Sequence, residues 1–352
     1  MLKGHKRIRS SELRPLKALA ALSFCASMAL WGLGATAAAQ NKARLSLDWL
    51  PSPFHANFYG GVKKGFFKAE GIDVEFISGR GSAAAVRNVG AGKAELGLAS
   101  TIQTTIGRAR KLSVLIVQMK MHRANESMFY VAGGKIRTPK DVEGKKVGFV
   151  GGGGLDKNFL AFAKIHNLNA STINLIAISP QVMSSQLLTG KIDGFITYST
   201  VRGAFEGPAR GKGQKIKWFN FSQMGLDLYG NGVISTEAVL KDNPRLVQGF
   251  VKAALRSTKW SIENPQEAVK LVTEALPAVN PNVAKTVFGE MAITFTDSIT
   301  PKKGIGWVDP QKMARTVSFV NDFMEMPRKV NANEVYTNRF VEKTPKEWRF
   351  VK

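Results

Sequence analysis

The sequence is nearly free of cysteine and poor in histidine. Its 352 residues include one cysteine, Cys25, and four histidines. Cys25 lies within the first 39 residues, so the rest of the chain has no thiol for disulfides, thiolate nucleophiles or cysteine-ligated metals. Beyond that segment, His55, His122 and His166 are too widely separated for their spacing to indicate a zinc site. We therefore predict no bound metal.

Acidic residues and catalytic motifs are also scarce. The chain has 26 Asp and Glu against 50 Lys and Arg, which gives a net charge of +24. The basic residues match no nucleic-acid-binding motif, so we expect a solvated basic surface and no nucleic-acid partner. No G-x-S-x-G, H-E-x-x-H or phosphate-loop motif occurs, so the motifs predict no enzyme.

Residues 1–39 have the pattern of a secretory signal peptide. Six basic residues and one acidic residue precede an apolar run over residues 18–34, and small residues in an A-x-A pattern follow it. We predict cleavage after Ala39, with Ala37 as the alternative, and the bulky residue before Cys25 disfavours lipoprotein processing. Cleavage after Ala39 would leave an exported protein of 313 residues with a net charge of +19. No other stretch approaches the roughly 20 apolar residues that span a bilayer.

Short apolar segments alternate with helical spacing over most of the remaining chain. The predicted strands are 43–49, 74–77, 95–99, 145–150 and 194–197, and the predicted helices are 57–69, 82–91 and 158–167. This alternation predicts an α/β fold with a mostly parallel sheet covered by helices. Residues 203–213 are polar and rich in glycine, which predicts a surface loop.

Two similar phrases indicate two α/β lobes. Gly92–Gly97, with the sequence GKAELG, is echoed by Gly190–Phe195, with the sequence GKIDGF. Each phrase predicts a helix that ends on glycine, a charged turn and the start of an apolar strand.

From Thr236 onward the chain is predicted to be helical. Asn-Pro or Asp-Pro pairs, which suit the start of a helix, occur at 243–244, 264–265, 280–281 and 309–310. We therefore predict a signal peptide at 1–39, the first part of lobe 1 at 40–133, lobe 2 at 134–234, and a segment at 235–352 that returns to lobe 1 and ends in helices.

Aromatic and polar side chains gather where the first predicted strand ends. Trp49 and Tyr59 offer flat faces to a ring, and His55 can donate or accept a hydrogen bond. The alternative interpretation makes Trp49 a core residue and His55 a helix cap.

Two further predicted strand ends favour a ligand atom that accepts hydrogen bonds. Arg80 and Ser82 precede one helix, and Ser100 and Thr101 precede the next. Free N–H groups at a helix start attract anionic or strongly accepting atoms. Ordinary helix capping is the alternative interpretation at each place.

The second predicted lobe has comparable positions. Residues 151–154 are four glycines, which would let backbone amides approach a ligand closely. They are no dinucleotide fingerprint, because Asp156 stands where the spacing requires glycine, and a flexible turn is the alternative. Tyr198 follows strand 194–197 as the counterpart of Ser100 and Thr101.

A set of motifs runs along nearly the whole chain after residue 39. These are Leu47-Asp48-Trp49, Pro51, His55, Tyr59, Lys64-Gly65-Phe66-Phe67, Gly71-Ile72-Asp73-Val74, Gly92–Gly97, Val142–Gly148, Gly306–Pro310 and Val335–Phe340. Together they resemble the motifs of ABC-transporter solute-binding proteins of the sulfonate, nitrate and thiamine-pyrimidine-precursor group, with the pyrimidine-precursor branch nearest. Val142 or Glu143 stands where the family often has leucine.

The resemblance implies a type II periplasmic-binding-protein fold, in which two α/β lobes joined by a two-strand hinge close on a ligand. It assigns ligand-binding positions to residues of both lobes and of the return crossing. These are Trp49, His55, Tyr59, Ser100, Thr101, Gly152, Gly153, Gly154, Tyr229 and Asn231, with Asp227 as a partner for a ring amine.

One branch that resembles these binders is an enzyme, the eukaryotic pyrimidine synthase, which holds pyridoxal phosphate. The resemblance places its lysine and histidine at Ala99 and Gln103, and its cysteine-rich segment near 227–233, where this chain has no cysteine. Without the amine no Schiff base can form there, so we expect neither an enzyme nor a cofactor.

The sequence therefore predicts the periplasmic solute-binding component of an ABC importer. The expected ligand is a small heteroaromatic such as a thiamine pyrimidine precursor. We expect the protein to be a monomer whose partner is the membrane permease. One alternative keeps the fold but binds a sulfonate or another small organic anion through Arg80, Ser82, Ser100 and the glycine loop. Another is a sensor subunit that presents its ligand to a receptor.

Overall fold

The computed structural model describes residues 41–150 and 154–351. Residues 40–352 form one compact unit. The predicted signal peptide and its cleavage site, together with Gly152 and Gly153, lie outside the described residues. Within these ranges no helix has the length and apolar character needed to cross a membrane.

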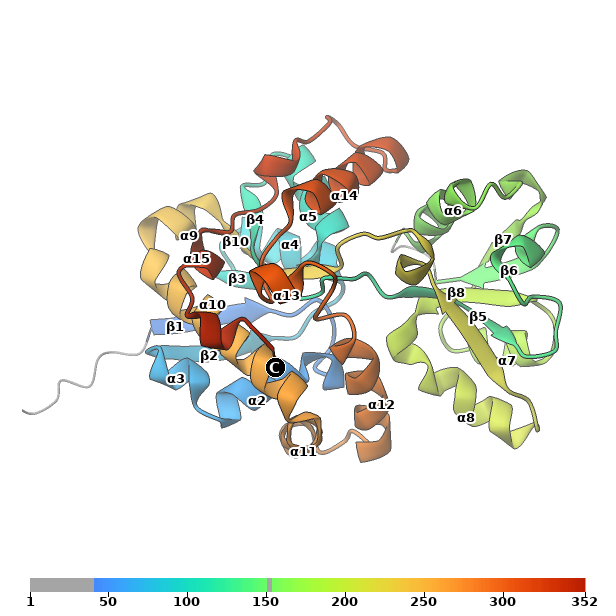
Figure 1. Ribbon diagram of the computed structural model, residues 1–352, viewed down its shortest axis with the longest axis horizontal. Helices are drawn as coiled ribbons and strands as arrows, with labels where there is room; N and C mark the ends of the chain where they lie inside the picture. The colour runs from blue at the N-terminus through green and yellow to red at the C-terminus, as the bar shows by residue number, and fades with distance from the viewer. Residues whose placement is uncertain (1–40, 151–153, 352) are drawn as a thin grey trace, which may run out of the picture. The chain divides into compact units, whose positions relative to one another are not determined.

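The first sheet has five strands in the order β2-β1-β3-β10-β4 (Figure 1). Its members are β1 (Asn41–Ser46), β2 (Ile72–Ile77), β3 (Leu96–Ser100), β4 (Val114–Met119) and β10 (Asn231–Thr236). β1 pairs in parallel with β2 and β3, whereas β10 runs antiparallel to β3 and β4. We call the elements built on this sheet the first lobe.

The second sheet repeats this arrangement with the order β7-β6-β8-β5-β9. Its members are β5 (Glu126–Val131), β6 (Lys146–Phe149), β7 (Asn174–Ala177), β8 (Gly194–Tyr198) and β9 (Ile216–Asn220). β6 pairs in parallel with β7 and β8, and β5 is the antiparallel insert. In each sheet the antiparallel strand, β10 or β5, therefore comes directly after a segment that crosses from the other sheet.

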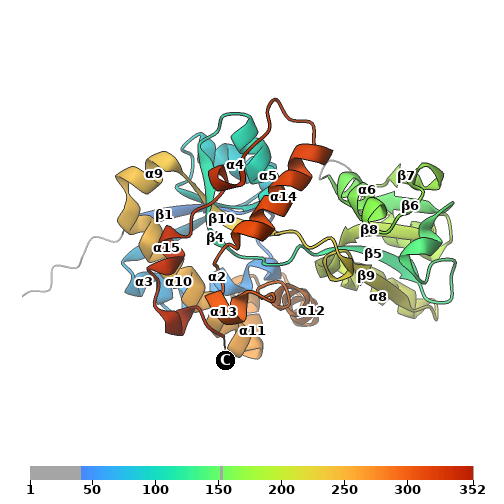
Figure 2. The same ribbon diagram turned by 45° about the horizontal axis from the view of Figure 1, so that its top comes forward.

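Helices cover both faces of the first sheet. α2 (Ala56–Lys63), α3 (Phe66–Ala69) and α10 (Pro244–Glu263) share one apolar cluster with β1, through residues such as Leu45, Phe58 and Phe250. α4 (Ser82–Gly90) and α5 (Thr101–Ala109) pack with β4 and β10 in another cluster. Figures 1 and 2 show the two helix layers on either side of the strands.

The second sheet is also covered on both faces because the side chains of β5 alternate. Met128 packs with α6 (Leu155–Ile165), whereas Phe129 packs with α7 (Met183–Leu188) and α8 (Gly203–Gly211). Short 3-10 turns connect the elements of the two lobes: η1 (Pro53–His55), η2 (Pro139–Val142), η3 (Ala170–Thr172), η4 (Ser199–Val201) and η5 (Ser222–Met224).

The helix starts predicted at the Asn-Pro and Asp-Pro pairs are confirmed. The remaining elements are α9 (Glu237–Asp242), α11 (Pro265–Ala275), α12 (Pro281–Ala292), α13 (Thr300–Lys303), α14 (Pro310–Phe323), η6 (Ala332–Glu334), α15 (Arg339–Glu342) and η7 (Lys346–Trp348). Asn243, Asn280 and Asp309 accept a backbone hydrogen bond at the start of their helices. Asn264 instead donates its side-chain amide to the carbonyl of Trp260.

The prediction of a surface loop over residues 203–213 is wrong, because α8 occupies 203–211. Three glycines and Pro208 weaken helix propensity there. Phe205 and Ala209, however, lie four residues apart and are both buried, and the Phe205 ring stacks on Phe129 with 4.8 Å between centroids. Tertiary packing of one helix face therefore outweighs the local preference.

Two segments connect the sheets and pair with each other. The first runs from Met119 to Glu126, and the second from Asn220 to Asn231. The backbone amides of Lys120 and Met121 both donate to the carbonyl of Asn231, at 3.0 and 2.8 Å. Sheet membership would put the lobe boundaries in these two segments rather than at the predicted residues 133 and 234.

The two echoed sequence phrases occupy equivalent places. Both end a helix on a glycine of positive φ, Gly92 or Gly190, and lead into the third parallel strand of their sheet. The Glu95 carboxylate then accepts from the backbone amide of Arg44 at 2.8 Å, and the Asp193 carboxylate from that of Lys146 at 3.0 Å. The charged residue of each phrase thus bonds its turn to β1 or β6, the middle one of the three parallel strands in its sheet.

Candidate ligand-binding site

Three loops at one edge of the first sheet are held together by hydrogen bonds. The amides of Gly79 and Gly81 donate to the carbonyls of Trp49 and Asp48, at 3.1 and 2.9 Å. The amide of Ser100 donates to Ser82 Oγ at 3.0 Å. A Cβ on Gly79 would lie 1.9 Å from the carbonyl oxygen of Leu47, so only glycine fits this approach.

Trp49, Leu50 and Arg80 have exposed side chains at this edge. Trp49 is 59% exposed and lies beyond the end of β1, so the interpretation as a core residue is wrong. Arg80 is also exposed and has no ion-pair partner among the described residues. Tyr59 is half-buried, with its ring 4.7 Å from that of Phe76. The edge therefore presents an open indole face and a free guanidinium.

A buried polar network lies behind the Trp49 loop. His55 Nε2 lies 2.9 Å from Asp48 Oδ1, and Asn231 donates its side-chain amide to Asp48 Oδ2. Burial raises the pKa of Asp48, but the bonds from His55, the charge of Lys120 and the bond from Asn231 outweigh it and hold this pKa below its ordinary value. An ionised Asp48 requires His55 Nε2 to be the donor, which leaves Nδ1 as a buried atom without a partner.

His55 therefore does not cap the following helix, because its side chain accepts no hydrogen bond from that helix start. It is fully buried and orients the Asp48 carboxylate from inside the lobe. Contact of His55 with a ligand stays a prediction.

Lys120 connects the first crossing segment to the same loop. Its ammonium donates to the carbonyl of Phe54 at 3.0 Å and lies 3.8 Å from the centroid of the Phe54 ring. The side chain is 1% exposed, and this burial lowers the pKa of Lys120 to about 7 against the attraction of Asp48. Sequence reasoning missed this residue, since a single lysine among many carries no pattern.

Three predicted site residues have polar groups already bonded within the protein. Thr101 is fully buried and donates its hydroxyl to the carbonyl of Gly230 at 2.8 Å. Tyr229 is 1% exposed, and its hydroxyl accepts from the amide of Asp309 at 2.7 Å. Asp227 pairs with the Lys312 ammonium at 2.5 Å. The structure does not bring these groups to the exposed edge, and their ligand contacts stay predictions.

The second lobe places Tyr198 and Gly154 at the matching edge of its sheet. Tyr198 ends β8 and is 38% exposed, and Gly154, with φ of +81°, precedes α6. Burial raises the pKa of the Tyr198 hydroxyl, and the carboxylates of Glu126 and Asp48 raise it further.

Glu126 is a candidate that sequence reasoning missed. It begins β5 directly across from Tyr198, and its Oε1 accepts from the side-chain amide of Asn158 at 3.0 Å. Burial raises the pKa of Glu126, whereas the bond from Asn158 lowers it. The sequence offered one signal, which is an acidic residue at the start of an apolar strand in a chain with few acidic residues.

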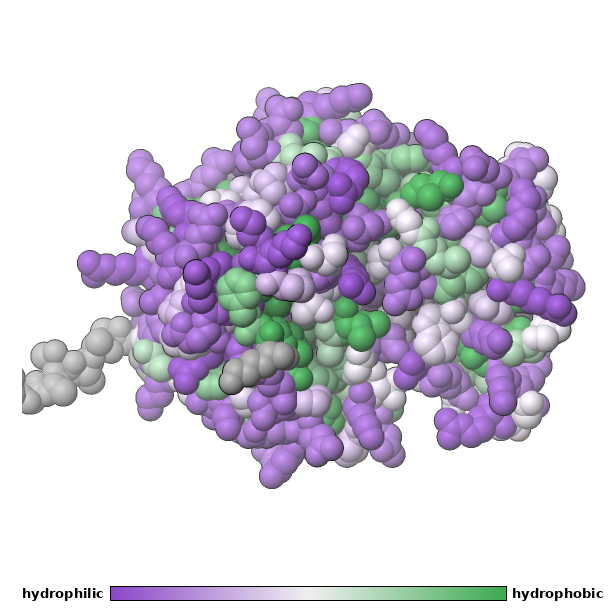
Figure 3. All heavy atoms as spheres, viewed as in Figure 1, coloured by the Kyte–Doolittle hydropathy of each residue, from purple (hydrophilic) through white to green (hydrophobic). Residues whose placement is uncertain are grey.

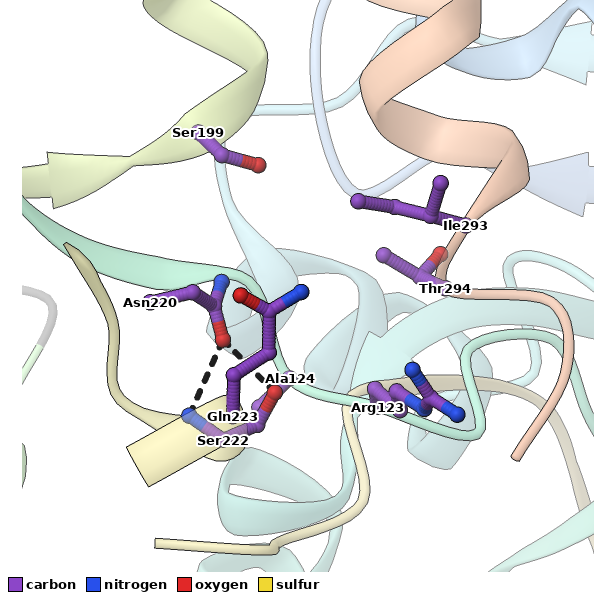
Figure 4. Close-up of a pocket in the computed structure, with 8 residues that line it drawn as sticks. All are labelled: Arg123, Ala124, Ser199, Asn220, Ser222, Gln223, Ile293 and Thr294. Carbon is purple, nitrogen blue, oxygen red and sulfur yellow. Dashed lines mark hydrogen bonds between the residues drawn. The ribbon is translucent and has the colours of Figure 1, made fainter. Parts of the chain in front are cut away.

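A small hollow lies where the first crossing segment meets both lobes (Figure 4). Its lining residues are Arg123, Ala124, Ser199, Asn220, Ser222, Gln223, Ile293 and Thr294, none of which was predicted to bind ligand. Ser199 is 1% exposed, and its hydroxyl is buried without a hydrogen-bond partner. Asn220 Oδ1 accepts from the amide and the hydroxyl of Ser222, at 2.9 and 2.6 Å.

Metal-ligating side chains do not gather in the described part of the chain. No group of three or more His, Cys, Asp or Glu residues there could hold an ion.

Figure 3 shows hydrophilic residues over most of one face, with hydrophobic residues in separate patches.

A family profile described as NMT1/THI5 like matches residues 52–268, which is more than half of the chain. The chain belongs to the NMT1/THI5-like family. The match begins shortly before His55 and Tyr59 and extends through both crossing segments, whereas Asp48 and Trp49 lie just before it.

Curated relatives of this NMT1/THI5-like protein include binders and synthases. The formylaminopyrimidine-binding protein of Halalkalibacterium halodurans is 23% identical over 295 residues, covering 82% of this chain and 88% of the relative. The riboflavin-binding protein RibY of Chloroflexus aurantiacus is 25% identical, with coverage of 85% and 86%. A 4-amino-5-hydroxymethyl-2-methylpyrimidine phosphate synthase of Saccharomyces cerevisiae is 22% identical, with coverage of 74% and 78%.

A solved structure confirms the fold. The putative periplasmic sulfonate-binding protein SsuA of Methylobacillus flagellatus superposes with a TM-score of 0.70 at 16% identity, covering 88% of this chain and 95% of that chain. The NMT1/THI5-like chain therefore has the predicted periplasmic-binding-protein fold, with two α/β lobes joined by two crossing segments.

Proposed function

We propose that this NMT1/THI5-like protein is the periplasmic solute-binding component of an ABC importer and captures a small heteroaromatic solute between its lobes. The observation that carries the proposal is Trp49. An indole that is 59% exposed, on a loop bonded to its neighbours at Asp48 and Trp49, is a prepared surface for stacking a ring.

The second lobe supplies the other wall of the proposed site. Tyr198 offers a second aromatic face, and Glu126 offers a carboxyl group beside it. A ligand that touches both lobes stabilises the closed arrangement by the affinity it gains there. The closed protein would then dock on the permease.

The relatives favour a ring of the pyrimidine or flavin type, since two of them are named as binders of such compounds. We propose binding without catalysis, because Ala99 and Gln103 stand where the resemblance places the lysine and histidine of the synthases. Ala99 is fully buried in β3 and has no group that could form a Schiff base.

An anionic ligand is the second candidate, and Arg80 favours it. This exposed guanidinium has no ion-pair partner in the described ranges, and it lies on the same edge as Ser82 and Ser100. A sulfonate would suit such a group. The neighbouring Trp49 face would then serve the organic part of the molecule.

A thermal-shift screen of refolded, ligand-free protein separates these candidates. The panel contains a formylaminopyrimidine, riboflavin, alkanesulfonates and nitrate. A compound that binds only the folded state stabilises it by about 2.7 kcal/mol at one hundred times its Kd. We expect the melting temperature to rise with a heteroaromatic ring. If the melting temperature rises with sulfonates alone, the ligand is an anion and the heteroaromatic ring is excluded.

A further inference from the structure

Basic residues gather at the end of the second sheet that lies opposite the crossing segments. β5 follows the first crossing segment and β9 leads into the second, so the end of β5 and the start of β9 lie at this opposite end (Figure 1). The chain there consists of segments 132–146, 190–193 and 210–217. Each segment contains lysine or arginine, and 210–217 has four such residues and no acidic residue.

Backbone hydrogen bonds hold these three segments side by side. The amide of Ala132 donates to the carbonyl of Lys215 at 2.8 Å, and the amide of Asp193 donates to the carbonyl of Lys146 at 2.8 Å. Segment 132–146 is therefore bonded to both of the others. Their basic side chains belong to one surface of the folded second lobe.

Most of the positive charge on this surface is not neutralised by ion pairs. The acidic residues of the three segments are Asp141, Glu143 and Asp193, and each already binds a lysine or a backbone amide. The lysines and arginines of these segments that are exposed and have no ion pair with a described residue are Arg137, Lys146, Lys191, Arg210, Lys212, Lys215 and Lys217. We call this set of side chains the basic end.

The matching end of the first sheet is built differently. Lys42 there pairs with Glu75 at 2.7 Å, and Arg44 pairs with Glu95 at 2.6 Å. The two ends hold equivalent places in sheets of the same strand arrangement. The basic end is therefore a property of the second lobe's own sequence and is not required by the fold.

The residue types of the basic end suit a surface that carries many separate negative charges. Lysines, which act as flexible point charges, outnumber arginines in the set. The three segments contain no aromatic residue that could stack on a nucleic-acid base. An anionic bilayer presents many phosphates in one plane, and each lysine or arginine held near it strengthens binding about fivefold.

We propose that the basic end of the second lobe binds the surface of a bilayer rich in anionic phospholipid. The inference goes beyond the proposed function, because it requires an exported protein but no particular solute. Tyr198 ends β8 at the opposite end of the same sheet, so contact with the bilayer through the basic end leaves the proposed solute site uncovered. Binding of this kind would concentrate the protein near the membrane that holds its permease.

Co-sedimentation of the 40–352 chain with vesicles tests the inference. The vesicles contain phosphatidylglycerol and phosphatidylcholine, and vesicles of phosphatidylcholine alone serve as the uncharged reference. Lys212→Gln, Lys215→Gln and Lys217→Gln in one variant remove three charges from the basic end. We expect this triple variant to bind the anionic vesicles about 100-fold more weakly than wild type, because three fivefold contributions are lost.

A second triple variant controls for net charge. Lys93→Gln, Arg110→Gln and Lys111→Gln remove three charges from exposed residues at the matching end of the first lobe, where these side chains also have no ion pair with a described residue. We expect this control to bind within about threefold of wild type, because only the long-range attraction changes. Equal losses in the two triple variants would show that binding follows net charge, and would overturn the inference.

Two further outcomes would also overturn it. One is a wild-type protein that does not sediment with the anionic vesicles, and the other is tighter binding to duplex DNA at the same phosphate concentration. Circular dichroism shows that each variant is folded, and the thermal-shift screen should give the basic-end variant the same solute response as wild type. A failed vesicle test therefore leaves solute capture standing, and a failed solute screen leaves the basic end standing.

Discussion

His55 Nε2 donates to Asp48 Oδ1 over 2.9 Å, and both side chains are buried behind the loop that exposes Trp49. Asn231 binds the other oxygen of Asp48 from the start of β10. Residues from the loop and from the end of the second crossing segment therefore meet at one carboxylate. The hydrogen bonds of Asp48 therefore connect the Trp49 loop to the second crossing segment, which joins the lobes.

Replacing His55 should destabilise the protein strongly. His55→Leu leaves the Asp48 charge buried with one hydrogen bond fewer, so we expect a loss of about 2–4 kcal/mol in the free energy of unfolding. Urea denaturation measures it. His166→Leu is the control, because His166 is half-buried and lies 2.8 Å from a backbone carbonyl rather than a charge. Equal losses in both variants would contradict the role given to the Asp48 pair.

The Asp48 pair should also shape acid denaturation. The pKa of Asp48 is lower in the folded chain than its ordinary value of 3.8. The unfolded chain therefore binds the proton first, and the stabilisation from this group is complete above pH 3.8 and lost as pH falls further. We expect Asp48→Asn to flatten the loss of stability below that pH, measured by urea denaturation across the acid range. If Asp48→Asn and wild type lose the same free energy of unfolding below pH 3.8, this assignment is wrong.

Lys120 should make stability rise with pH above neutrality. Its folded pKa of about 7 lies below the ordinary value of 10.5, so the unfolded chain holds an extra proton between these values. Stability then increases with pH through this window, by up to about 1.4 kcal/mol per pH unit. Lys120→Met should remove this slope between pH 7 and 9. The prediction fails if wild type and Lys120→Met show parallel profiles in urea denaturation.

The contact between α12 and η4 should behave as one coupled ion pair. Arg202 Nη1 lies 2.5 Å from Glu290 Oε1, and Glu290 is 8% exposed. The guanidinium also lies 5.0 Å from the centroid of the Trp218 ring. A double-mutant cycle of Arg202→Met and Glu290→Gln should give a coupling energy of about 1–3 kcal/mol in unfolding. Additive single effects would show that the pair contributes nothing specific.

Local patterns predicted much of the fold. The Asn-Pro and Asp-Pro pairs marked four helix starts, and the GKAELG and GKIDGF phrases marked equivalent strand starts in both sheets. α8 was missed because its burial depends on Phe205 meeting Phe129, a residue far away in the sequence. The same limit applies to the site. Exposure of Trp49 follows from where β1 ends, and the bond between Asp48 and Asn231 joins residues 183 positions apart.

The most direct test of the account is the contribution of Trp49 to ligand affinity. Calorimetric titration of ligand-free protein with a formylaminopyrimidine compares wild type with Trp49→Ala and Trp49→Phe. Loss of the indole should weaken binding by about 1–2 kcal/mol, roughly 5- to 30-fold, and Trp49→Phe should retain most of the affinity because a ring remains for stacking. A Trp49→Ala variant that binds the pyrimidine as tightly as wild type would contradict the account.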